Sequence, residues 1–377
     1  MALYIGLMSG TSLDGVDGVI AEFDDNDHAP SHALAHAHLA MPAALHDELM
    51  ALNQRGADEL HRAALAANEL AALYGQCVRQ LLTDAAVEAT QVRAIGAHGQ
   101  TVRHRPGEFG RSGYTLQLLN GAWLAGHTGI DTVCDFRSAD LVAGGQGAPL
   151  APAFHAACFA RADETVLVLN LGGIANLSVL RGAQDVLGFD CGPGNALMDL
   201  WCRQHRGEPF DRDGAWAASG RVLPAVMKSM LTEPFFALAP PKSTGRDLFH
   251  AEWLRTHLTV HPPAAPADVM ATISELTART SSDAASPFAA TARELLVCGG
   301  GVHNGHLMRR IGTMLPQLQV SSTATRGAAP DQIEALAFAW LARAHVLRRP
   351  GNLPSVTGAY APRVLGAMHP ATQATRG

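Results

Sequence analysis

A strand, a glycine-rich turn and a second strand follow one another twice in this chain, about half its length apart. In the first copy, residues 3–23 contain two apolar runs joined by the turn 9–15. In the second copy, residues 165–180 contain two apolar runs joined by the turn 172–176. Short apolar runs bounded by glycine and small polar residues are typical of strands joined by turns. Because the pattern recurs, we predict two halves of related design.

Strands and helices alternate along the rest of the chain. Helices are predicted at residues 57–85, 195–206, 304–315 and 331–348, and further strands at 92–96 and 294–298. This alternation is typical of the α/β class. The 377 residues are enough for two or three domains of about 150 residues each. We expect the glycine-rich segment 144–149 to be the first crossover between the halves.

Composition argues against several classes of function. Charged residues make up 16% of the chain, its formal net charge is -6, and no lysine- or arginine-rich run is present. We therefore expect no nucleic-acid partner. The six cysteines form no Cys-x-x-Cys pair, which favours a reducing compartment, the cytoplasm. No apolar run approaches the roughly 20 residues of a membrane helix, and the first residues lack a signal-peptide pattern, so we expect no membrane association.

Three glycine-rich turns follow or join predicted strands, at residues 9–15, 172–176 and 299–301. Glycine lets the backbone approach a phosphate closely, and backbone amides with Ser and Thr hydroxyls bind its oxygens. A single such turn is weak support, because hairpins also need glycine for conformational reasons. Three of them favour a nucleotide site, although the P-loop and Rossmann signatures are absent from the sequence.

Asp190 is the carboxylate whose position is most typical of catalysis. It follows a predicted strand and precedes the turn Gly192-Pro193-Gly194, which leads into a helix. A carboxylate held there can act as a general base, or it can cap the helix. Asn195 is also able to cap that helix, and spacing alone leaves both roles of Asp190 open.

Two further polar patterns have alternative interpretations. The stretch from Lys242 to Arg246 places two cations and two hydroxyls together, as in an anion site or a basic surface loop. His28, His32 and His36 lie four residues apart, as in a metal site on a helix, but no carboxylate or cysteine completes the set. An exposed edge strand explains the histidines better.

The chain resembles the anhydro-N-acetylmuramic acid kinase family, within the superfamily of acetate and sugar kinases, heat-shock ATPases and actin. The motif Gly-Leu-Met-Ser-Gly-Thr-Ser-Leu-Asp-Gly-Val-Asp at residues 6–17 carries this resemblance most specifically. Further matching motifs lie at residues 96–101, 135–137, 143–150, 170–173, 188–190, 241–246 and 297–301. The resemblance therefore covers essentially the whole chain.

The resemblance implies two ribonuclease-H-like domains that flank an active-site cleft. We expect the first domain at residues 1–135, joined by residues 350–377, and the second at residues 136–349. The implied reaction uses water to open the 1,6-anhydro ring of anhydro-N-acetylmuramic acid and transfers the γ-phosphoryl group of ATP to O6. Magnesium and a homodimer are also expected. An ordinary sugar kinase and a non-catalytic nucleotide-dependent binding protein are the alternatives.

The resemblance also assigns roles to matched residues. It implies that Asp190 is the catalytic base and that Glu334 is a second active-site carboxylate. The implied ATP-binding residues are Gly10, Thr11, Ser12, Leu13, Asp14, Gly15, Val16, Asp17, Gly172, Gly173, Gly299, Gly300 and Gly301. The sugar-binding candidates are Ser9, His98, Gln100 and Arg137, and Arg137 is suited to a bidentate pair with the lactyl carboxylate. Magnesium is expected to bind the phosphate oxygens and to use few direct protein ligands, and no residue is assigned as one.

Overall fold

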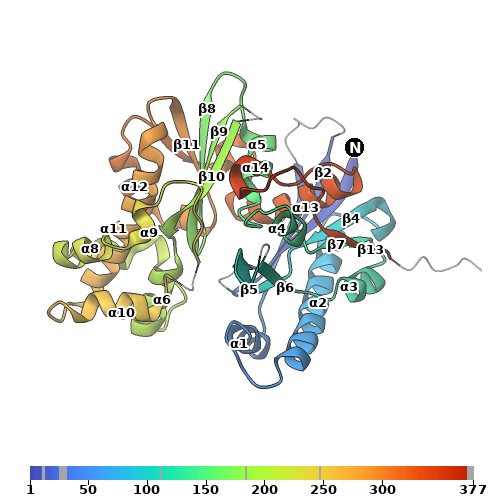
Figure 1. The fold of residues 1–377 in the computed structure, drawn as a ribbon, viewed down its shortest axis with the longest axis horizontal. Coiled ribbons are helices and arrows are strands. Elements are labelled where there is room, and N and C mark those ends of the chain that lie inside the picture. The colour runs from blue at the N-terminus through green and yellow to red at the C-terminus, as the bar shows by residue number, and fades with distance from the viewer. Residues whose placement is uncertain (11–12, 25–31, 111–112, 183–184, 246–247, 372–377) are drawn as a thin grey trace, which may run out of the picture. The chain divides into compact units, whose positions relative to one another are not determined.

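The computed structural model describes residues 1–10, 13–24, 32–110, 113–182, 185–245 and 248–371. The chain divides into two compact units. Unit 1 comprises Met1–Cys158 and Gln332–Gly377, and unit 2 comprises Phe159–Asp331. Each unit contains a mixed sheet with helices packed against it (Figure 1).

The sheet of unit 1 has the strand order β13-β7-β4-β1-β2-β3. Its strands are β1 (Ala2–Met8), β2 (Gly15–Phe23), β3 (His32–Ala40), β4 (Val92–Ala97), β7 (Thr132–Cys134) and β13 (Ala367–His369). Strands β1, β2 and β3 form an antiparallel meander, whereas β4 is parallel to β1 and β7 is parallel to β4. A separate two-stranded sheet joins β5 (Gln100–Pro106) to β6 (Gly113–Leu118).

The sheet of unit 2 repeats this topology in the order β10-β9-β8-β11-β12. Its strands are β8 (Thr165–Leu171), β9 (Ile174–Arg181), β10 (Asp185–Pro193), β11 (Ala292–Cys298) and β12 (Gln319–Ser322). Strands β8, β9 and β10 are antiparallel, β11 is parallel to β8 and β12 is parallel to β11. A meander joined through its first strand to two parallel strands is the ribonuclease-H-like order. The predicted α/β class and the two related halves are therefore confirmed.

Two helices pack on opposite faces of β1 in unit 1. Helix α2 (Glu59–Asp84) buries Leu70 and Tyr74 in the same core cluster as Leu7. Gly6 points to the other face, because successive residues of a strand alternate. There a Cβ atom at Gly6 would lie 1.8 Å from the carbonyl oxygen of Ala335 in helix α13 (Ile333–Val346). A close approach of α13 therefore requires glycine on β1, and Gly96 of β4 meets α13 at Phe338 in the same way.

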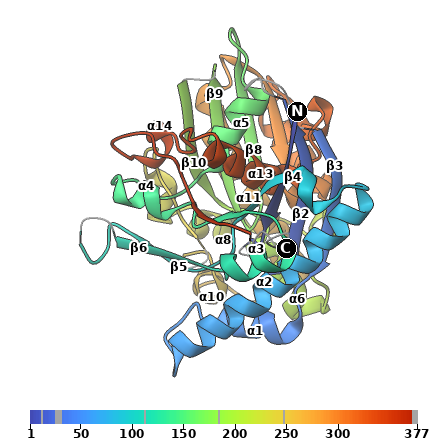
Figure 2. The ribbon, with the colours of Figure 1, turned by 90° about the vertical axis from the view of Figure 1, so that its right-hand side faces the viewer.

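The remaining helices have the following bounds. Unit 1 contains α1 (Ala43–Ala51), α3 (Gly121–Thr128), α4 (Ser138–Val142) and α14 (Pro354–Thr357), and α5 (Ala151–Phe159) contains the first crossing between units. Unit 2 contains α6 (Ala196–Arg206), α7 (Ala215–Ser219), α8 (Pro224–Met230), α9 (Pro234–Ala237), α10 (Ala251–Thr259), α11 (Pro266–Ala285) and α12 (Gly305–Met314). Figure 2 shows the length of α2, against which α1 and α3 pack. No helix within the described ranges is long and apolar enough to cross a membrane.

The boundaries between the units differ from those expected from the sequence. The chain leaves unit 1 after Cys158 instead of after residue 135, and it returns at Gln332 instead of at residue 350. The return is earlier because α13 packs against β1 and β4 and so belongs to the core of unit 1. The crossing lies later because α4 and the glycine-rich segment 144–149 are hydrogen-bonded to residues of unit 1.

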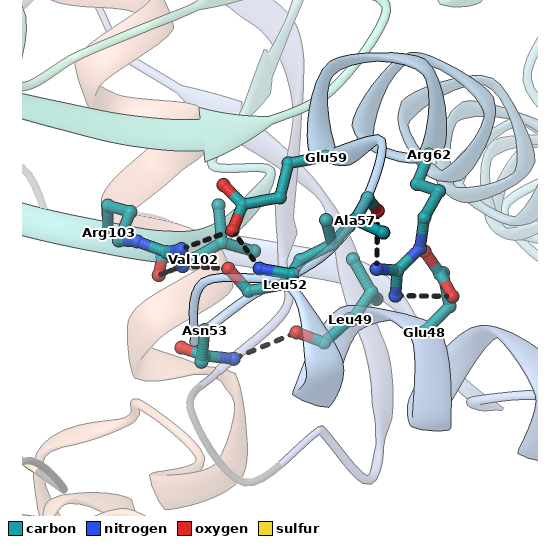
Figure 3. A network of polar contacts seen from close by, with 10 residues as sticks. Glu48, Leu49, Leu52, Asn53, Ala57, Glu59, Arg62, Val102 and Arg103 are labelled. Carbon is teal, nitrogen blue, oxygen red and sulfur yellow. Dashed lines mark hydrogen bonds and ion pairs between the residues drawn. The ribbon is translucent and has the colours of Figure 1, made fainter.

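Two arginines fix the connection between α1 and α2 (Figure 3). The Nε and Nη2 atoms of Arg62 donate to the two carboxylate oxygens of Glu48, at 2.7 and 3.1 Å. Arg103 of β5 donates to the carbonyl oxygen of Leu52 and, at 3.4 Å, to Oε1 of Glu59. The start of α2 and the end of α1 are therefore tied to the strand that begins with Gln100.

Candidate functional site

Three of the sugar-binding candidates meet where strands of unit 1 end. Ser9 directly follows β1, and His98 follows β4, which runs parallel to β1. The hydroxyl of Ser9 donates to Oε1 of Gln100 at 2.5 Å, and Nε2 of Gln100 donates to the carbonyl oxygen of Gly10 at 3.2 Å. All three side chains are buried. Ligands of open α/β sheets bind at the carboxyl ends of such strands.

The fourth candidate, Arg137, contacts His98 directly. Its Nη2 and Nε atoms lie 2.9 and 3.3 Å from Nε2 of His98. Because a guanidinium has only donors, Nε2 accepts, and the proton of the neutral ring belongs on Nδ1. Nδ1 then donates to the carbonyl oxygen of Ser9 at 3.3 Å. Burial, assisted by the charge of Arg137, lowers the pKa of His98 to about 3, so the ring is neutral at physiological pH.

Arg137 is also bound on its other side. Its Nη1 atom donates to the carbonyl oxygen of Gly147 at 2.8 Å. The four candidates Ser9, His98, Gln100 and Arg137 thus form one hydrogen-bonded set within unit 1. The sequence placed them in three separate motifs, and the fold brings these motifs together.

The first predicted phosphate loop is described in part. Thr11 and Ser12 lie outside the described residues. The turn around them begins at Gly10, whose carbonyl oxygen accepts from the N–H of Leu13 at 3.2 Å. Leu13 has a φ of 56° and a buried side chain, and the Asp14 that follows is exposed. The described part of the turn is therefore held by backbone hydrogen bonding and by one buried apolar anchor.

The end of this motif, Gly15, Val16 and Asp17, belongs to strand β2. The carboxylate of Asp17 lies 2.8 Å from Nδ1 of His38 and 3.6 Å from Nε2 of His36, both on β3. Strand β3 is an edge of the sheet, which confirms the edge-strand interpretation of His36. His28 lies outside the described residues. Across the described ranges, no group of three or more His, Cys, Asp or Glu side chains is arranged to hold a metal ion.

In unit 2, Asp190 is held by the segment that follows α9. Its Oδ2 atom accepts from the backbone N–H of Thr244 at 2.8 Å and from the hydroxyl of Ser243 at 3.1 Å. The N–H of Asp190 donates to the carbonyl oxygen of Lys242 at 3.0 Å. Asp190 is buried and lies at an irregularity in the pairing of β10 with β9. Asn195, expected as an alternative cap, donates its side chain to Leu171 and does not cap α6.

The ammonium group of Lys242 is bound to α9 within unit 2. Its Nζ atom donates to the carbonyl oxygens of Phe235 and Phe236, each at 3.2 Å, and lies 4.7 Å from the centre of the Phe235 ring. Burial lowers the pKa of Lys242. Ser243 and Thr244 of the same segment donate to the carboxylate of Asp190. Arg246, the second cation of the motif, lies outside the described residues.

The glycine turns of unit 2 meet at the end of β8. The carbonyl oxygens of Gly172 and Gly173 accept from the N–H groups of Asn195 and Gly194, at 2.8 and 3.0 Å. A Cβ atom at Gly194 would lie 2.2 Å from the carbonyl oxygen of Gly172. The turn after Asp190 is therefore packed directly on the second predicted phosphate loop.

The third glycine turn approaches the same point. Gly299 has a φ of +77°, and a Cβ atom there would lie 2.4 Å from Oδ1 of Asn170. A Cβ atom at Gly301 would lie 2.5 Å from the Cβ of Leu171, whereas at Gly300 the nearest atom would be Nδ2 of Asn195, at 3.9 Å. The second predicted phosphate loop and the turn predicted to contact adenosine thus lie together at the end of β8.

Sequence reasoning missed a row of amides beside Asp190. Asn176 stands opposite Asp190 on the neighbouring strand, and Asn170 stands opposite Asn176 on the next one. Directly opposed residues of paired strands lie on the same face. In the sequence, the two asparagines stand on either side of the glycines in the turn of the second predicted hairpin. Only the strand register shows that they lie beside Asp190.

Glu334 lies in the first turn of α13, in unit 1. Its side chain is half-buried, in contrast to the surface position that an amphipathic helix would give it. The following residue, Ala335, is the one that contacts Gly6 of β1. Glu334 is therefore held on a helix that packs directly against β1 and β4.

Comparison with known proteins identifies the family. A family profile described as anhydro-N-acetylmuramic acid kinase matches residues 2–371. A Variovorax paradoxus protein of the same name is 57% identical over 98% of this chain and 99% of its own length. Its namesake from Albidiferax ferrireducens is 53% identical, and one from Bordetella parapertussis is 55% identical over 98% of this chain and 96% of its own.

Solved structures with a similar arrangement share little sequence. An activator of 2-hydroxyisocaproyl-CoA dehydratase from Clostridium difficile, with bound ADPNP, is 12% identical, covers 89% of this chain and 92% of its own, and has a TM-score of 0.46. A Streptomyces griseus glucokinase of the ROK family is also 12% identical, over 91% of this chain and 99% of its own, with a TM-score of 0.39. The profile match and the close relatives show that this chain belongs to the anhydro-N-acetylmuramic acid kinase family.

Proposed function

We propose that the protein is an ATP-dependent kinase that opens the 1,6-anhydro ring of anhydro-N-acetylmuramic acid with water and phosphorylates O6. The products are N-acetylmuramic acid 6-phosphate and ADP, as in the recycling of peptidoglycan. Membership of the family supports this reaction. The structural observation that carries it is the fixed carboxylate of Asp190, with Thr244 and Ser243 both donating to Oδ2.

Asp190 would serve as the general base. Two donors on Oδ2 restrict rotation of the carboxylate, and geometry is the first requirement of a base. The base takes a proton from the water that attacks C1, and the bond between C1 and O6 breaks. O6 then attacks the γ-phosphorus of ATP, so its developing charge is neutralised by phosphorus instead of by a proton. A second carboxylic acid, which glycosidases use to protonate the leaving oxygen, is then unnecessary.

The sugar would be bound by Ser9, His98, Gln100 and Arg137. His98 occupies Nε and Nη2 of Arg137, so the lactyl carboxylate cannot pair with that edge of the guanidinium. The lactyl carboxylate would therefore approach the guanidinium from another side. Neutral His98 serves here as an acceptor that orients the arginine.

ATP would be bound by the glycine turns, with Gly10 to Asp17 and Gly172-Gly173 at the phosphates and Gly299 to Gly301 at adenosine. Glycine supports this role because it lets the backbone approach a phosphate closely. Magnesium, bound to the phosphate oxygens, would neutralise charge during transfer. Glu334, on the first turn of α13, is proposed as a second active-site carboxylate.

Product analysis in heavy-oxygen water tests the proposed reaction. The purified protein is incubated with the anhydro sugar, ATP and magnesium, and the products are examined by mass spectrometry at short times. We expect a sugar phosphate that has gained one water, with the heavy oxygen at C1 and none on phosphorus. Unlabelled product held in heavy water for the same time corrects for exchange at C1. A phosphorylated sugar that has not gained water would support the ordinary-kinase alternative.

Two further parts of the proposal have their own tests. Excess chelator should abolish turnover and added magnesium should restore it, whereas turnover that persists in chelator would remove the metal from the mechanism. The resemblance also implies a homodimer, and sedimentation equilibrium at the mass of one chain would contradict that.

A further inference from the structure

Asp140 is a fully buried carboxylate in α4 that has no role in the site described above. Its exposed fraction is 0%. Oδ1 accepts from Nδ2 of Asn352 at 2.6 Å and from the hydroxyl of Thr357 at 2.7 Å. Oδ2 accepts from the backbone N–H of Gly147 at 2.7 Å. Burying a carboxylate is costly unless donors satisfy it, so this set of three donors requires a structural or functional reason.

The glycine-rich segment 144–149 is folded closely around this carboxylate. A Cβ atom at Gly145 would lie 2.1 Å from Oδ2 of Asp140, so only glycine fits there. Gly147 has a φ of +68°, which also favours glycine. The N–H of Gln146 donates to the carbonyl oxygen of Thr357 at 2.8 Å, so the C-terminal part of unit 1 holds the same segment.

Gly147 connects Asp140 to Arg137. Its N–H donates to Asp140, and its carbonyl oxygen accepts from Nη1 of Arg137 at 2.8 Å. His98 binds the opposite edge of the same guanidinium. Two groups therefore hold the guanidinium of Arg137. His98 directly follows strand β4, whereas Gly147 lies in a loop whose conformation depends on the buried carboxylate of Asp140.

We propose that Asp140 is a positioning residue for the sugar site, which acts by holding the carbonyl oxygen of Gly147 against Arg137. The guanidinium is thereby held in one orientation between His98 and Gly147, in which it binds an anionic group of the substrate. This inference rests on the proposed role of Arg137 in binding the sugar. It extends the site to the buried residues Asp140, Asn352 and Thr357.

Asp140→Asn is the most direct variant, because it preserves size while replacing one acceptor oxygen with a donor. The new side-chain NH2 group must then face donors, either the N–H of Gly147 or the donor groups of Asn352 and Thr357. The loop loses the corresponding hydrogen bonds. Losing a hydrogen bond to a charged group shifts the equilibrium between the ordered and the loosened loop by a factor of roughly ten or more. We therefore expect the KM for the anhydro sugar to rise by about that factor, with the KM for ATP nearly unchanged.

A double-mutant cycle decides whether Asp140 acts through Arg137. The KM for the sugar is measured for Asp140→Asn, Arg137→Ala and the double variant. If Asp140 acts only by orienting Arg137, the double variant should bind sugar no more weakly than Arg137→Ala, because coupled residues are not additive. Independent, multiplied effects would overturn the inference.

Matched variants separate positioning from general destabilisation. Asp211 of unit 2 is also buried and accepts from the N–H groups of Trp216 and Ala217, at 2.9 and 2.8 Å. Asp211→Asn should lower the melting temperature and leave the KM for the sugar unchanged. Thr357→Val should raise the KM for the sugar, whereas Thr357→Ser, which keeps the hydroxyl, should not. If Asp140→Asn does not fold, the comparison of Thr357→Val with Thr357→Ser tests the inference in its place.

The outcomes separate this inference from the function on which it rests. An unchanged KM for the sugar in Asp140→Asn and Thr357→Val, beside a raised KM in Arg137→Ala, overturns the role of Asp140 alone. An unchanged KM in Arg137→Ala removes Arg137 from the sugar site and the role of Asp140 with it. If the proposed reaction itself is wrong, the wild-type protein forms no ring-opened sugar phosphate in the product analysis, before any variant is tested.

Discussion

The backbone N–H of Thr244 donates a hydrogen bond to Oδ2 of Asp190 at 2.8 Å. The carboxylate therefore depends for its orientation on a segment more than fifty positions later in the chain. The N–H of Asp190 donates back to the carbonyl oxygen of Lys242, so strand and segment hold each other. Lys242 itself is bound to α9 through the carbonyl oxygens of Phe235 and Phe236.

Asp190→Asn should reduce the rate of product formation by about a hundred- to ten-thousand-fold, the usual cost of losing a general base. The amide keeps the shape of the side chain but cannot take a proton from water. Ring opening and phosphoryl transfer should fall together, as measured by sugar consumption and ADP release. Ring opening at the wild-type rate in this variant would exclude Asp190 as the base.

Ser243→Ala should lower kcat by up to roughly tenfold, because it removes one of two identified donors to Oδ2 and loosens the carboxylate. The KM values for sugar and ATP should change little. Ser219→Ala is the control, since that hydroxyl donates to the carbonyl oxygen of Trp216 on the surface of the same unit. Equal kcat values for the two variants would show that the Ser243 hydroxyl is dispensable.

Glu334→Ala should depress kcat while leaving the melting temperature nearly unchanged. The side chain is partly exposed in the first turn of α13, so its truncation removes little buried packing. Steady-state kinetics and thermal unfolding measure the two quantities on the same preparation. Wild-type activity would remove Glu334 from the active site, whereas a large loss of stability would assign it to packing.

The wild-type protein should lose stability as the pH falls below about 6.5. Burial holds the pKa of His98 at about 3, whereas the unfolded chain protonates this ring near its ordinary value. The unfolded state therefore binds the additional proton between these two values, and stability declines toward low pH. In His98→Gln, the slope of unfolding free energy between pH 6 and 4.5 should shrink by up to about 1.4 kcal/mol per pH unit.

Urea denaturation at several pH values measures that slope. His155, whose pKa burial also lowers to about 3, contributes in the same direction and is present in both proteins. The difference between the two slopes therefore isolates His98. Identical slopes would mean that His98 is protonated in the folded protein, in conflict with its acceptor role toward Arg137.

Gly6→Ala should destabilise unit 1 by about 1–3 kcal/mol or more, because the added methyl group would overlap the backbone of α13. Gly126→Ala is the matched control: this exposed glycine in α3 has nothing within 4 Å of its Cβ position. That substitution should stabilise the helix by about 0.5–1 kcal/mol. Chemical denaturation compares the two, and equal midpoints would show that α13 moves without cost.

Many of the helices and strands could be predicted from local sequence patterns. The predicted helix at residues 57–85 is α2 (Glu59–Asp84), and the one at 304–315 is α12 (Gly305–Met314). These predictions succeeded because apolar periodicity and turn residues act over a few positions. The repeated hairpins likewise predicted two related halves, and five strands of the sheet in unit 1 have the order of the five strands in unit 2. The expected division of the chain was less accurate, because the packing of α13 on Gly6 and Gly96 cannot be read from helix periodicity.

The sequence by itself determined the α/β class, the positions of the glycine turns and the motifs that mark the family. Only the tertiary structure decided which polar groups hold one another. It placed Ser243 and Thr244 on Asp190, and it placed Gly147 between Asp140 and Arg137. The physical reason is that buried donors and acceptors must find partners wherever the folded chain provides them, and those partners are set by strand register and loop closure between distant segments.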